Sequence, residues 1–299
     1  MNDPAEDKFL VYRIGCEYVT LSLEIYHGAE GTIAMKFYVS VDMEGIAGIA
    51  LREQIFRGEP FYPEARQLLT DEVNVVVEAL AQAGATEIVV KDAHATGFNF
   101  LYDRLHPAAT YAMGPLPIPN RFAGVDSSFD GALLLGYHAM AGTEAAILDH
   151  TYSTADIYRL ALNGSPIGEI GVDALLFGLH GVPVVFVSGD DKTCAEAKRQ
   201  LGEVFTYETK RAAGRHSGVL KAPKRVYAEI GEAVQSAVRG RKACKPYTLE
   251  GPYEMEIEYT SARLAEGRTG KDADTTRIDG RTVRLRDDDL VRLVTRTFA

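Results

Sequence analysis

Carboxylate and imidazole side chains follow short apolar segments at several separated places in the chain. Asp42 and Glu44 lie two residues apart, directly after the apolar run 37–41. His94 and His138 each follow another run of this kind. Because residues i and i+2 of a strand project from one face, Asp42 and Glu44 can converge on a single point. Two carboxylates so close repel each other, and either water or a cation must compensate them.

A repeating strand-then-helix pattern begins at Met35 and positions these side chains. Apolar runs predict the strands, and apolar residues at helical spacing predict the helices, as for the segment 62–83 that Gly84 ends. The strands are predicted over 36–41, 87–91, 131–136, 158–162 and 182–188, and the helices over 62–83, 169–180 and 191–205. We therefore predict an α/β fold, a mostly parallel sheet covered by helices.

The pattern changes beyond residue 205. A helix over 223–238, an alternating strand over 255–259, a hairpin and a last helix predict a smaller α+β C-terminal domain. The expected domains are thus a catalytic α/β domain at 35–205 and the α+β domain at 206–299. Residues 1–34 do not fit this pattern and are interpreted as an N-terminal extension. Three interpretations of this extension are open: the product of an upstream start codon, a disordered segment, or an edge hairpin.

The predicted strands bring these side chains to one edge of the sheet. In open α/β sheets, ligands bind outside the carboxyl ends of the strands, where Asp42, Glu44, His94 and His138 are expected. Glu169 is a fifth candidate, although its charge at a helix N-terminus also has a structural explanation. Carboxylates combined with imidazoles suit zinc and related ions better than calcium. Five ligands exceed the need of one zinc ion and suit two ions that share a carboxylate.

The chemistry that such a metal pair implies is hydrolysis. Two ions lower the pKa of a bridging water toward neutrality and polarise a carbonyl or phosphoryl oxygen. His150, in the polar segment 149–153, is a natural acid/base, nucleophile or hydrogen-bond donor for this reaction. His106, His180 and His216 are interpreted as structural residues.

Composition narrows the partners and the compartment. The 299 residues carry a formal net charge of -10, which disfavours nucleic acid as a partner. Three widely spaced cysteines predict no disulfide framework and favour the reducing cytoplasm. The N-terminus is acidic where a secretory signal would be basic, and we expect no membrane association.

Several short segments stand in a fixed order along the chain. They are Ser40-Val-Asp-Met-Glu-Gly45, Asp92-Ala-His94, Gly136-Tyr-His-Ala-Met-Ala-Gly142, His150-Thr-Tyr-Ser153, Leu162-Asn-Gly164, Gly168-Glu169-Ile-Gly171, Gly181-Val-Pro-Val184 and Val187-Ser-Gly-Asp-Asp191. This ordered set, which is specific as a set, resembles the D-aminopeptidase family of dinuclear zinc metallopeptidases. The resemblance covers residues 35–299.

This resemblance implies an aminopeptidase that hydrolyses the N-terminal residue of short peptides, with D-residues preferred. It implies two zinc ions per chain, bridged by Asp42, with the remaining ligands supplied by Glu44, His94, His138 and Glu169. His150 matches the family's catalytic residue, assigned there as a nucleophile, although acid/base or oxyanion support is equally natural chemically. The family's ring-shaped decamer implies a homo-oligomer. Family members begin near Met35, so residues 1–34 are a departure.

Two alternatives remain open. A dinuclear amidase or phosphohydrolase would use the same two metals, but a phosphatase would want basic residues or a glycine-rich cradle beside them. The sequence contains neither a P-loop nor a Gly-x-Gly-x-x-Gly motif. A metal-binding assembly protein without turnover would bind the ions and leave peptides intact.

Overall fold

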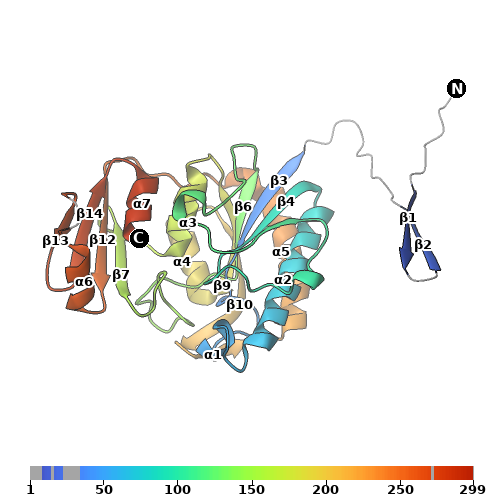
Figure 1. Cartoon of the computed structure of the whole chain (residues 1–299), viewed down its shortest axis with the longest axis horizontal. Helices are drawn as coiled ribbons and strands as arrows, with labels where there is room; N and C mark the ends of the chain where they lie inside the picture. Colours follow the sequence, from blue (N-terminus) through green and yellow to red (C-terminus); the bar gives the residue numbers. More distant parts are fainter. Residues whose placement is uncertain (1–8, 15–16, 23–33, 271–272, 299) are drawn as a thin grey trace. The chain divides into compact units, whose positions relative to one another are not determined.

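The computed structural model describes residues 9–14, 17–22, 34–270 and 273–298, in two compact units, 1–34 and 35–299 (Figure 1). In the first unit, β1 (Phe9–Ile14) pairs antiparallel with β2 (Glu17–Ser22). The second unit holds every candidate site residue.

A seven-stranded sheet forms the centre of the second unit. Its pairings are parallel except for the antiparallel edge strand β11. Its strands in spatial order are β11 (Ser217–Leu220), β10 (Phe205–Gly214), β9 (Val184–Asp190), β6 (Gly131–Leu135), β3 (Met35–Val41), β4 (Ala85–Asp92) and β5 (Thr110–Ala112). β6 and β9 are buried along their whole length, as expected for strands covered on both faces. The predicted mostly parallel sheet is confirmed.

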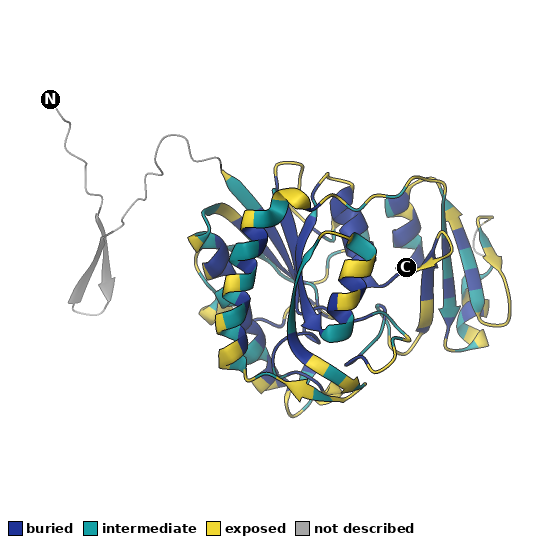
Figure 2. Cartoon of the chain, turned by 180° about the vertical axis from the view of Figure 1, so that it is seen from behind, coloured by how far each residue is buried: buried dark blue, intermediate teal, exposed yellow. Residues whose placement is uncertain are grey.

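Helices cover both faces of this sheet (Figures 1 and 2). α2 (Tyr62–Gln82) and α5 (Pro223–Gly240) share one buried core with Phe37, Val39 and Val41 of β3. α3 (Glu169–Gly178) and α4 (Asp191–Leu201) share the opposite core with Tyr38. The alternation along β3 follows from the two-residue period of a strand. The short helices are α1 (Arg52–Ile55), η1 (Tyr102–Arg104), η2 (Ile118–Asn120) and η3 (Arg241–Ala243).

A second sheet is antiparallel throughout. Its strands in spatial order are β13 (Thr275–Arg277), β14 (Thr282–Asp287), β12 (Tyr253–Tyr259), β7 (Ile157–Leu162) and β8 (Ser165–Pro166). Met255, Ile257 and Tyr259 point into the core together with residues of α7 (Leu290–Phe298), while α6 (Ala262–Arg268) follows β12. Among the described residues, no helix has the length and apolar character needed to cross a membrane.

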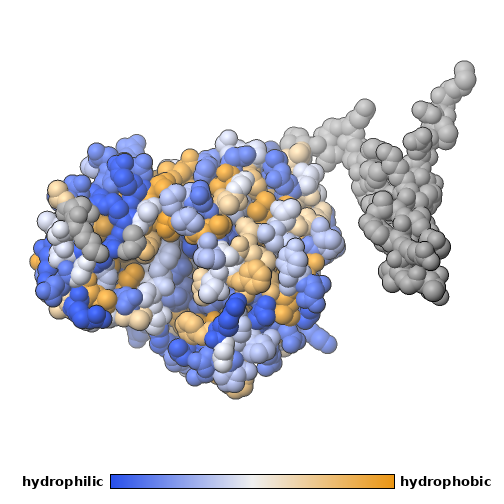
Figure 3. All heavy atoms as spheres, in the orientation of Figure 1, coloured by the Kyte–Doolittle hydropathy of each residue, from blue (hydrophilic) through white to orange (hydrophobic). Residues whose placement is uncertain are grey.

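The outer face of the second sheet carries paired charges. Arg284 Nε lies 3.0 Å from Glu254 Oε1, and Arg286 Nη2 lies 2.7 Å from Glu254 Oε2. Opposite charges on neighbouring strands stabilise a sheet modestly and keep this face hydrated. Hydrophilic side chains accordingly gather over this part of the molecule in the face that Figure 3 shows.

Each sheet contains segments from both sides of the domain boundary predicted between residues 205 and 206. β7 and β8 precede that boundary but pair within the C-terminal sheet. β10, β11 and α5 follow it but belong to the seven-stranded sheet and its cover. One buried core contains residues of α3 and of both sheets. The antiparallel second sheet, together with α6 and α7, gives the C-terminal part the α+β character that the sequence predicts.

Candidate metal centre and active site

The motif around Asp42 is fixed by close contact with the loop that follows β6. Asp42 and Glu44 lie just beyond the end of β3 and are buried. The Gly45 N–H donates to the Gly136 carbonyl at 2.7 Å, and a Cβ on Gly45 would come within 2.1 Å of the Tyr137 carbonyl oxygen. Gly45 is therefore required by close backbone approach, and not only by the turn that the sequence indicates.

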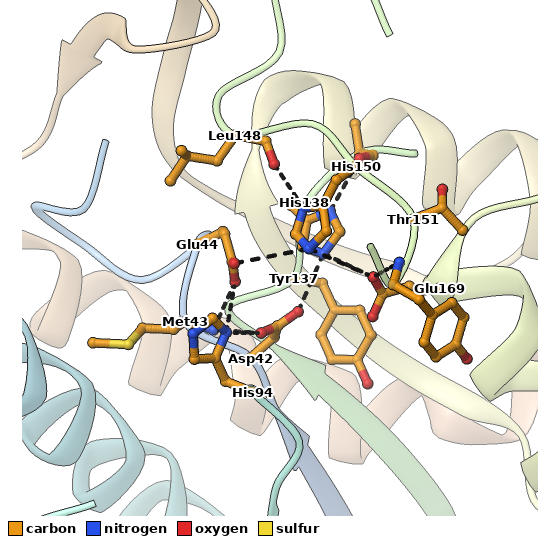
Figure 4. Close-up of polar contacts among 12 residues, drawn as sticks. Asp42, Met43, Glu44, His94, Tyr137, His138, Leu148, His150, Thr151 and Glu169 are labelled. Atoms are coloured by element: carbon orange, nitrogen blue, oxygen red, sulfur yellow. Dashed lines mark hydrogen bonds and ion pairs between the residues drawn. The ribbon is translucent and has the colours of Figure 1, made fainter. Parts of the chain in front are cut away.

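The other predicted ligands arrive from separate elements. His94 follows β4, His138 follows β6, and Glu169 is the first residue of α3. All three side chains are buried, and they converge on Asp42 and Glu44 (Figure 4). The parallel strands β3, β4 and β6 end at the same edge of the sheet, which is why residues far apart in sequence meet here.

The two oxygens of Asp42 face different imidazoles. Asp42 Oδ1 lies 3.0 Å from His94 Nδ1, and Asp42 Oδ2 lies 3.3 Å from His138 Nε2. Glu44 Oε2 lies 3.2 Å from His94 Nδ1, and Glu169 Oε1 lies 3.3 Å from His138 Nε2. Asp42 thus stands between a group with Glu44 and His94 and a group with His138 and Glu169. The structure brings all five predicted metal ligands together.

His150 lies against this cluster. Its ring stacks on the ring of His138, with centroids 3.9 Å apart and planes inclined by 14°. His150 Nε2 lies 3.8 Å from Glu169 Oε1 and 4.0 Å from Glu44 Oε1. Donor atoms of His138, His150 and Glu169 lie within 4.8 Å of one another, as do those of Asp42, Glu44 and His138. His150 therefore reaches the centre but stands at its rim.

The hydrogen bonds of the three imidazoles fix which nitrogen faces the carboxylates. The outward-facing nitrogens are His94 Nε2, His138 Nδ1 and His150 Nδ1, bonded to the carbonyl oxygens of Ile55, Ala139 and Leu148 at 2.8, 3.0 and 2.9 Å. A carbonyl only accepts, so each of these nitrogens carries the proton, and the other nitrogen of the neutral ring carries a lone pair.

These lone pairs face carboxylate oxygens, an arrangement that is repulsive unless a cation or a proton lies between. His138 Nε2 is buried and has no hydrogen-bond partner among the residues that the structure describes. Imidazole nitrogens and carboxylate oxygens are the donors that zinc prefers, and a backbone acceptor behind each histidine is typical of metal ligands. The residues present therefore fit a zinc centre.

The close approach of buried carboxylates and imidazoles also shifts the pKa values of the cluster. Burial disfavours the charged form of His94 and His138, but the Glu44, Glu169 and Asp42 carboxylates outweigh it and raise the pKa of both imidazoles well above the usual value. Burial likewise opposes ionisation of Asp42, yet the two imidazoles hold the pKa of Asp42 well below its usual value. In the metal-free chain, protons therefore occupy positions that a cation would take.

The loop after Glu44 is held by a buried ammonium group. Lys210 Nζ, from β10, donates to the carbonyl oxygens of Glu44, Ile46 and Ile49 at 2.5, 2.8 and 2.5 Å. Burial lowers the pKa of Lys210 to about 8. Thr209 Oγ1 donates to the Gly45 carbonyl at 2.6 Å. Side chains of β10 thereby supply hydrogen-bond donors to the backbone carbonyl groups of a loop that has no partner strand.

A cavity of about 550 Å³ opens beside the centre. Its lining includes Asp42, Glu44, His94, His150 and Glu169, together with Arg52, Ile55, Phe56, Arg121, Tyr152, Arg215 and His216. The arginines and Lys210 have no recognisable signal in the sequence, because they lie outside the motifs, in the short helix α1, in turns and in a polar strand. His216, interpreted as structural, also lines this cavity. His106 instead pairs with Glu78 on α2, and His180 is exposed.

Known proteins that are similar to this chain identify its family. The family model described as D-aminopeptidase, peptidase family M55, matches residues 35–298. A D-aminopeptidase of Bacillus subtilis (strain 168) is 32% identical over 232 residues, 78% of this chain and 84% of that one. The solved structure of the Zn-dependent D-aminopeptidase DppA from Bacillus subtilis, a self-compartmentalizing protease, superposes with a TM-score of 0.84 at 29% identity, covering 88% of this chain and 96% of that one. The chain therefore belongs to the D-aminopeptidase family of peptidases.

Proposed function

We propose that this protein is a zinc-dependent aminopeptidase that removes the N-terminal residue of short peptides, with D-residues preferred. Family membership supports the reaction class, and a similar protein of known structure is a Zn-dependent D-aminopeptidase. The observation that carries the proposal is a set of three histidines beside three buried carboxylates. One ring nitrogen of each histidine faces the carboxylates, and the other donates to a backbone carbonyl.

Five side chains would hold two zinc ions. Glu44 and His94 would bind one ion, His138 and Glu169 the other, and Asp42 would bridge them. The position of Asp42 between the two groups supports the bridging role. Bound there, zinc supplies polarisation of the scissile carbonyl and lowers the pKa of a water molecule.

His150 is proposed as the catalytic residue. Its Nδ1–H is held by the Leu148 carbonyl, which leaves Nε2 toward the cavity and the centre. Nε2 can accept a proton from a reacting group, or donate one to negative charge that develops on the carbonyl oxygen. It can also attack directly, the role implied by the family resemblance.

The assembly and the compartment follow from similarity and composition. DppA is described as self-compartmentalizing. We infer a homo-oligomer for this chain, a ring-shaped decamer that encloses the sites and admits short peptides only. The cytoplasm is the proposed compartment, since Cys194 and Cys244 are free thiols.

The test is turnover by the zinc-loaded protein on D-Ala-D-Ala and L-Ala-L-Ala, with zinc content measured on the same samples. Replacement of His150 by alanine should lower kcat by about 10²- to 10⁴-fold and leave the zinc content unchanged, because His150 lies at the rim of the centre. The matched control is His180→Ala, at an exposed position after α3. This variant should keep wild-type turnover.

Two results would contradict the proposal. Unchanged turnover in the His150 variant would remove this residue from the mechanism. A wild-type protein that retains zinc but leaves every peptide intact would instead be a metal-binding assembly protein.

A further inference from the structure

A buried arginine forms part of the cavity wall. Arg121 follows η2, and only 12% of its side chain is exposed. Its Nε donates to Asp173 Oδ1 at 2.7 Å, and its Nη2 donates to Asp173 Oδ2 at 3.0 Å. Asp173 is fully buried on α3, one turn after Glu169. This pair occupies two of the five guanidinium N–H groups, and the side chain also borders the cavity.

Aromatic side chains hold the guanidinium from the sides. The Arg121 Cζ atom lies 5.4 Å from the ring centroid of Tyr152 and 5.7 Å from that of Phe122. The backbone N–H of Tyr152 donates to Glu169 Oε1 at 2.7 Å. Tyr152 has a φ of 57°, an uncommon value for a bulky residue that often marks functional sites. Arg121 is therefore tied to the loop of His150 as well as to the helix of Glu169.

A buried network connects the same arginine to the remaining ligand motifs. Asp173 Oδ2 accepts from the Tyr137 hydroxyl at 2.6 Å, and that hydroxyl lies 2.7 Å from Ser40 Oγ. Tyr137 immediately precedes His138, and Ser40 stands two residues before Asp42. The position of the guanidinium relative to the metal centre is thus fixed through three separate elements. A buried ion pair contributes little net stability, so stability alone does not explain this network.

We propose that Arg121 binds the C-terminal carboxylate of a dipeptide substrate and makes the enzyme selective for dipeptides. This inference rests on the proposed aminopeptidase function. The planar guanidinium matches a carboxylate through paired hydrogen bonds, and its fixed position reduces the entropy lost on binding. In a dipeptide the carboxylate lies one residue beyond the scissile bond. Each added residue moves it by up to about 3.5 Å.

Two other arginines line the cavity but are less suited to this role. The side chain of Arg52 is 59% exposed and pairs with Glu59 at 2.9 Å. The side chain of Arg215 is 40% exposed and pairs with Asp149. Exposed ion pairs are weak, because water screens them and flexible side chains must be ordered to form them. Arg121 is the arginine whose position is set before substrate arrives.

The test compares D-Ala-D-Ala with its C-terminal amide and with the tripeptide D-Ala-D-Ala-D-Ala, all on zinc-loaded protein. The double variant Arg121→Met/Asp173→Asn avoids an unpaired buried carboxylate, and Asp173→Asn alone is its matched control. The preference for the dipeptide over its amide should fall by about 10- to 100-fold in the double variant relative to that control. The loss should appear in KM, because the contact exists before and during reaction. Arg52→Met should keep the wild-type preference.

Other outcomes overturn the inference. These are a wild-type enzyme that hydrolyses dipeptide and amide equally well, and a double variant that loses both substrates in equal proportion. Loss of the preference in Arg52→Met with retention in the Arg121 variant would move the role to Arg52. If the double variant does not fold, Arg121→Lys keeps the charge beside Asp173 but loses the fork, and a wild-type preference in it would also overturn the inference. A wild-type protein that hydrolyses no peptide would contradict the proposed function itself.

Discussion

At the scale of single residues, the central feature is the position of Asp42 between two imidazoles. Each of its oxygens faces a different histidine, at 3.0 and 3.3 Å, whereas Glu44 pairs with one of the two, His94, at 3.2 Å. The two carboxylates lie two residues apart in sequence but differ in the number of proposed ligand histidines with which they pair. Their removal should therefore have different consequences.

We expect Asp42→Ala to lose both zinc ions and Glu44→Ala to lose or weaken only one. The reason is that Asp42 would bridge the ions, while Glu44 would belong to a single group. Zinc per chain, measured after dialysis, checks this asymmetry. The exposed carboxylate of Asp71, which pairs with Arg104 on the surface, supplies the control variant Asp71→Ala. Equal zinc loss in the Asp42 and Glu44 variants would rule out the bridging assignment.

The gain in Tm that zinc gives should be larger at about pH 8 than at about pH 6. In the folded metal-free chain, the pKa of His94 and of His138 lies above the ordinary value of 6.5. A raised folded pKa stabilises the protein below the unfolded pKa, and this stabilisation is lost as pH rises through the folded value. Asp42, with its lowered pKa, stays ionised over this range. Zinc must displace the protons, so its advantage grows with pH.

Thermal unfolding of metal-free and zinc-loaded protein across this range provides the measurement. A gain in Tm that is the same at both pH values would show that protons and zinc do not compete at the centre.

The sequence predicts that the candidate ligand side chains meet at one edge of the sheet, but it does not predict their surroundings. Asp42, His94 and His138 follow apolar strands of a parallel sheet, and the geometry of such a sheet brings strand ends together. Arg121 lies after a proline-rich stretch without periodicity, and Lys210 lies in a polar run. Their positions depend on long-range packing, which no local pattern records.

At the scale of elements, β10 links the two motif loops to the sheet. Lys210 and Thr209 hold the loop after Glu44, and Arg215, in the turn that follows β10, donates to the Asp149 carbonyl oxygen at 2.6 Å. Asp149 precedes His150, and the loop of His150 also donates a hydrogen bond, from the Leu148 N–H to the Arg215 carbonyl. A strand that carries no proposed ligand thus positions both sides of the site.

Replacement of Lys210 by methionine should lower the free energy of unfolding by about 3 kcal/mol and weaken zinc retention. The substitution keeps an apolar chain of similar length but leaves three buried carbonyl groups without their donor. Urea unfolding and zinc loss to a chelator check the two effects. Lys221→Met, just after β11, is the matched control, because its partly exposed pair with Glu229 contributes at most about 1 kcal/mol.

The interpretation of β10 as a structural support of the site depends on both results. Zinc retention at the wild-type level in Lys210→Met would show that the loop after Glu44 keeps its conformation without this strand.

The predicted elements are mostly present, and their partners are less predictable. The helix predicted over 62–83 is α2, and Gly84 ends it with a φ of 93°, as expected for a C′ glycine. The strand predicted at 158–162 is β7, but it pairs with β12 in the second sheet. Apolar periodicity identifies a strand, whereas the choice of sheet depends on contacts between residues far apart in sequence.

At the scale of the whole molecule, residues 35–299 form a compact unit that contains every proposed site residue. The family model matches 35–298, a nearly identical range. The site uses residues from the loops that follow strands of the first sheet, from α3 and from the turn between β10 and β11. The unit is thus sufficient in composition for the proposed activity.

A protein that begins at Met35 should keep kcat/KM within about twofold of the full chain, because no candidate site residue lies in 1–34. Peptide turnover per zinc-loaded chain checks this expectation, and light scattering on the same samples reports the assembly. An extension that interferes with a ring should give the shorter protein the larger assembled mass. A tenfold loss of turnover at unchanged mass would assign residues 1–34 a direct part in the reaction.

The support that β10 gives to the loop after Glu44 has a consequence for biosynthesis. During translation, the five proposed zinc ligands leave the ribosome once Glu169 has emerged, but Thr209, Lys210 and Arg215 follow only later. Until then, the carbonyl groups at 44, 46 and 49 lack the ammonium that they surround in the folded chain. A nascent chain can therefore display all its ligands before it can hold them in place, and stable zinc loading is expected only after the β10–β11 hairpin has been made.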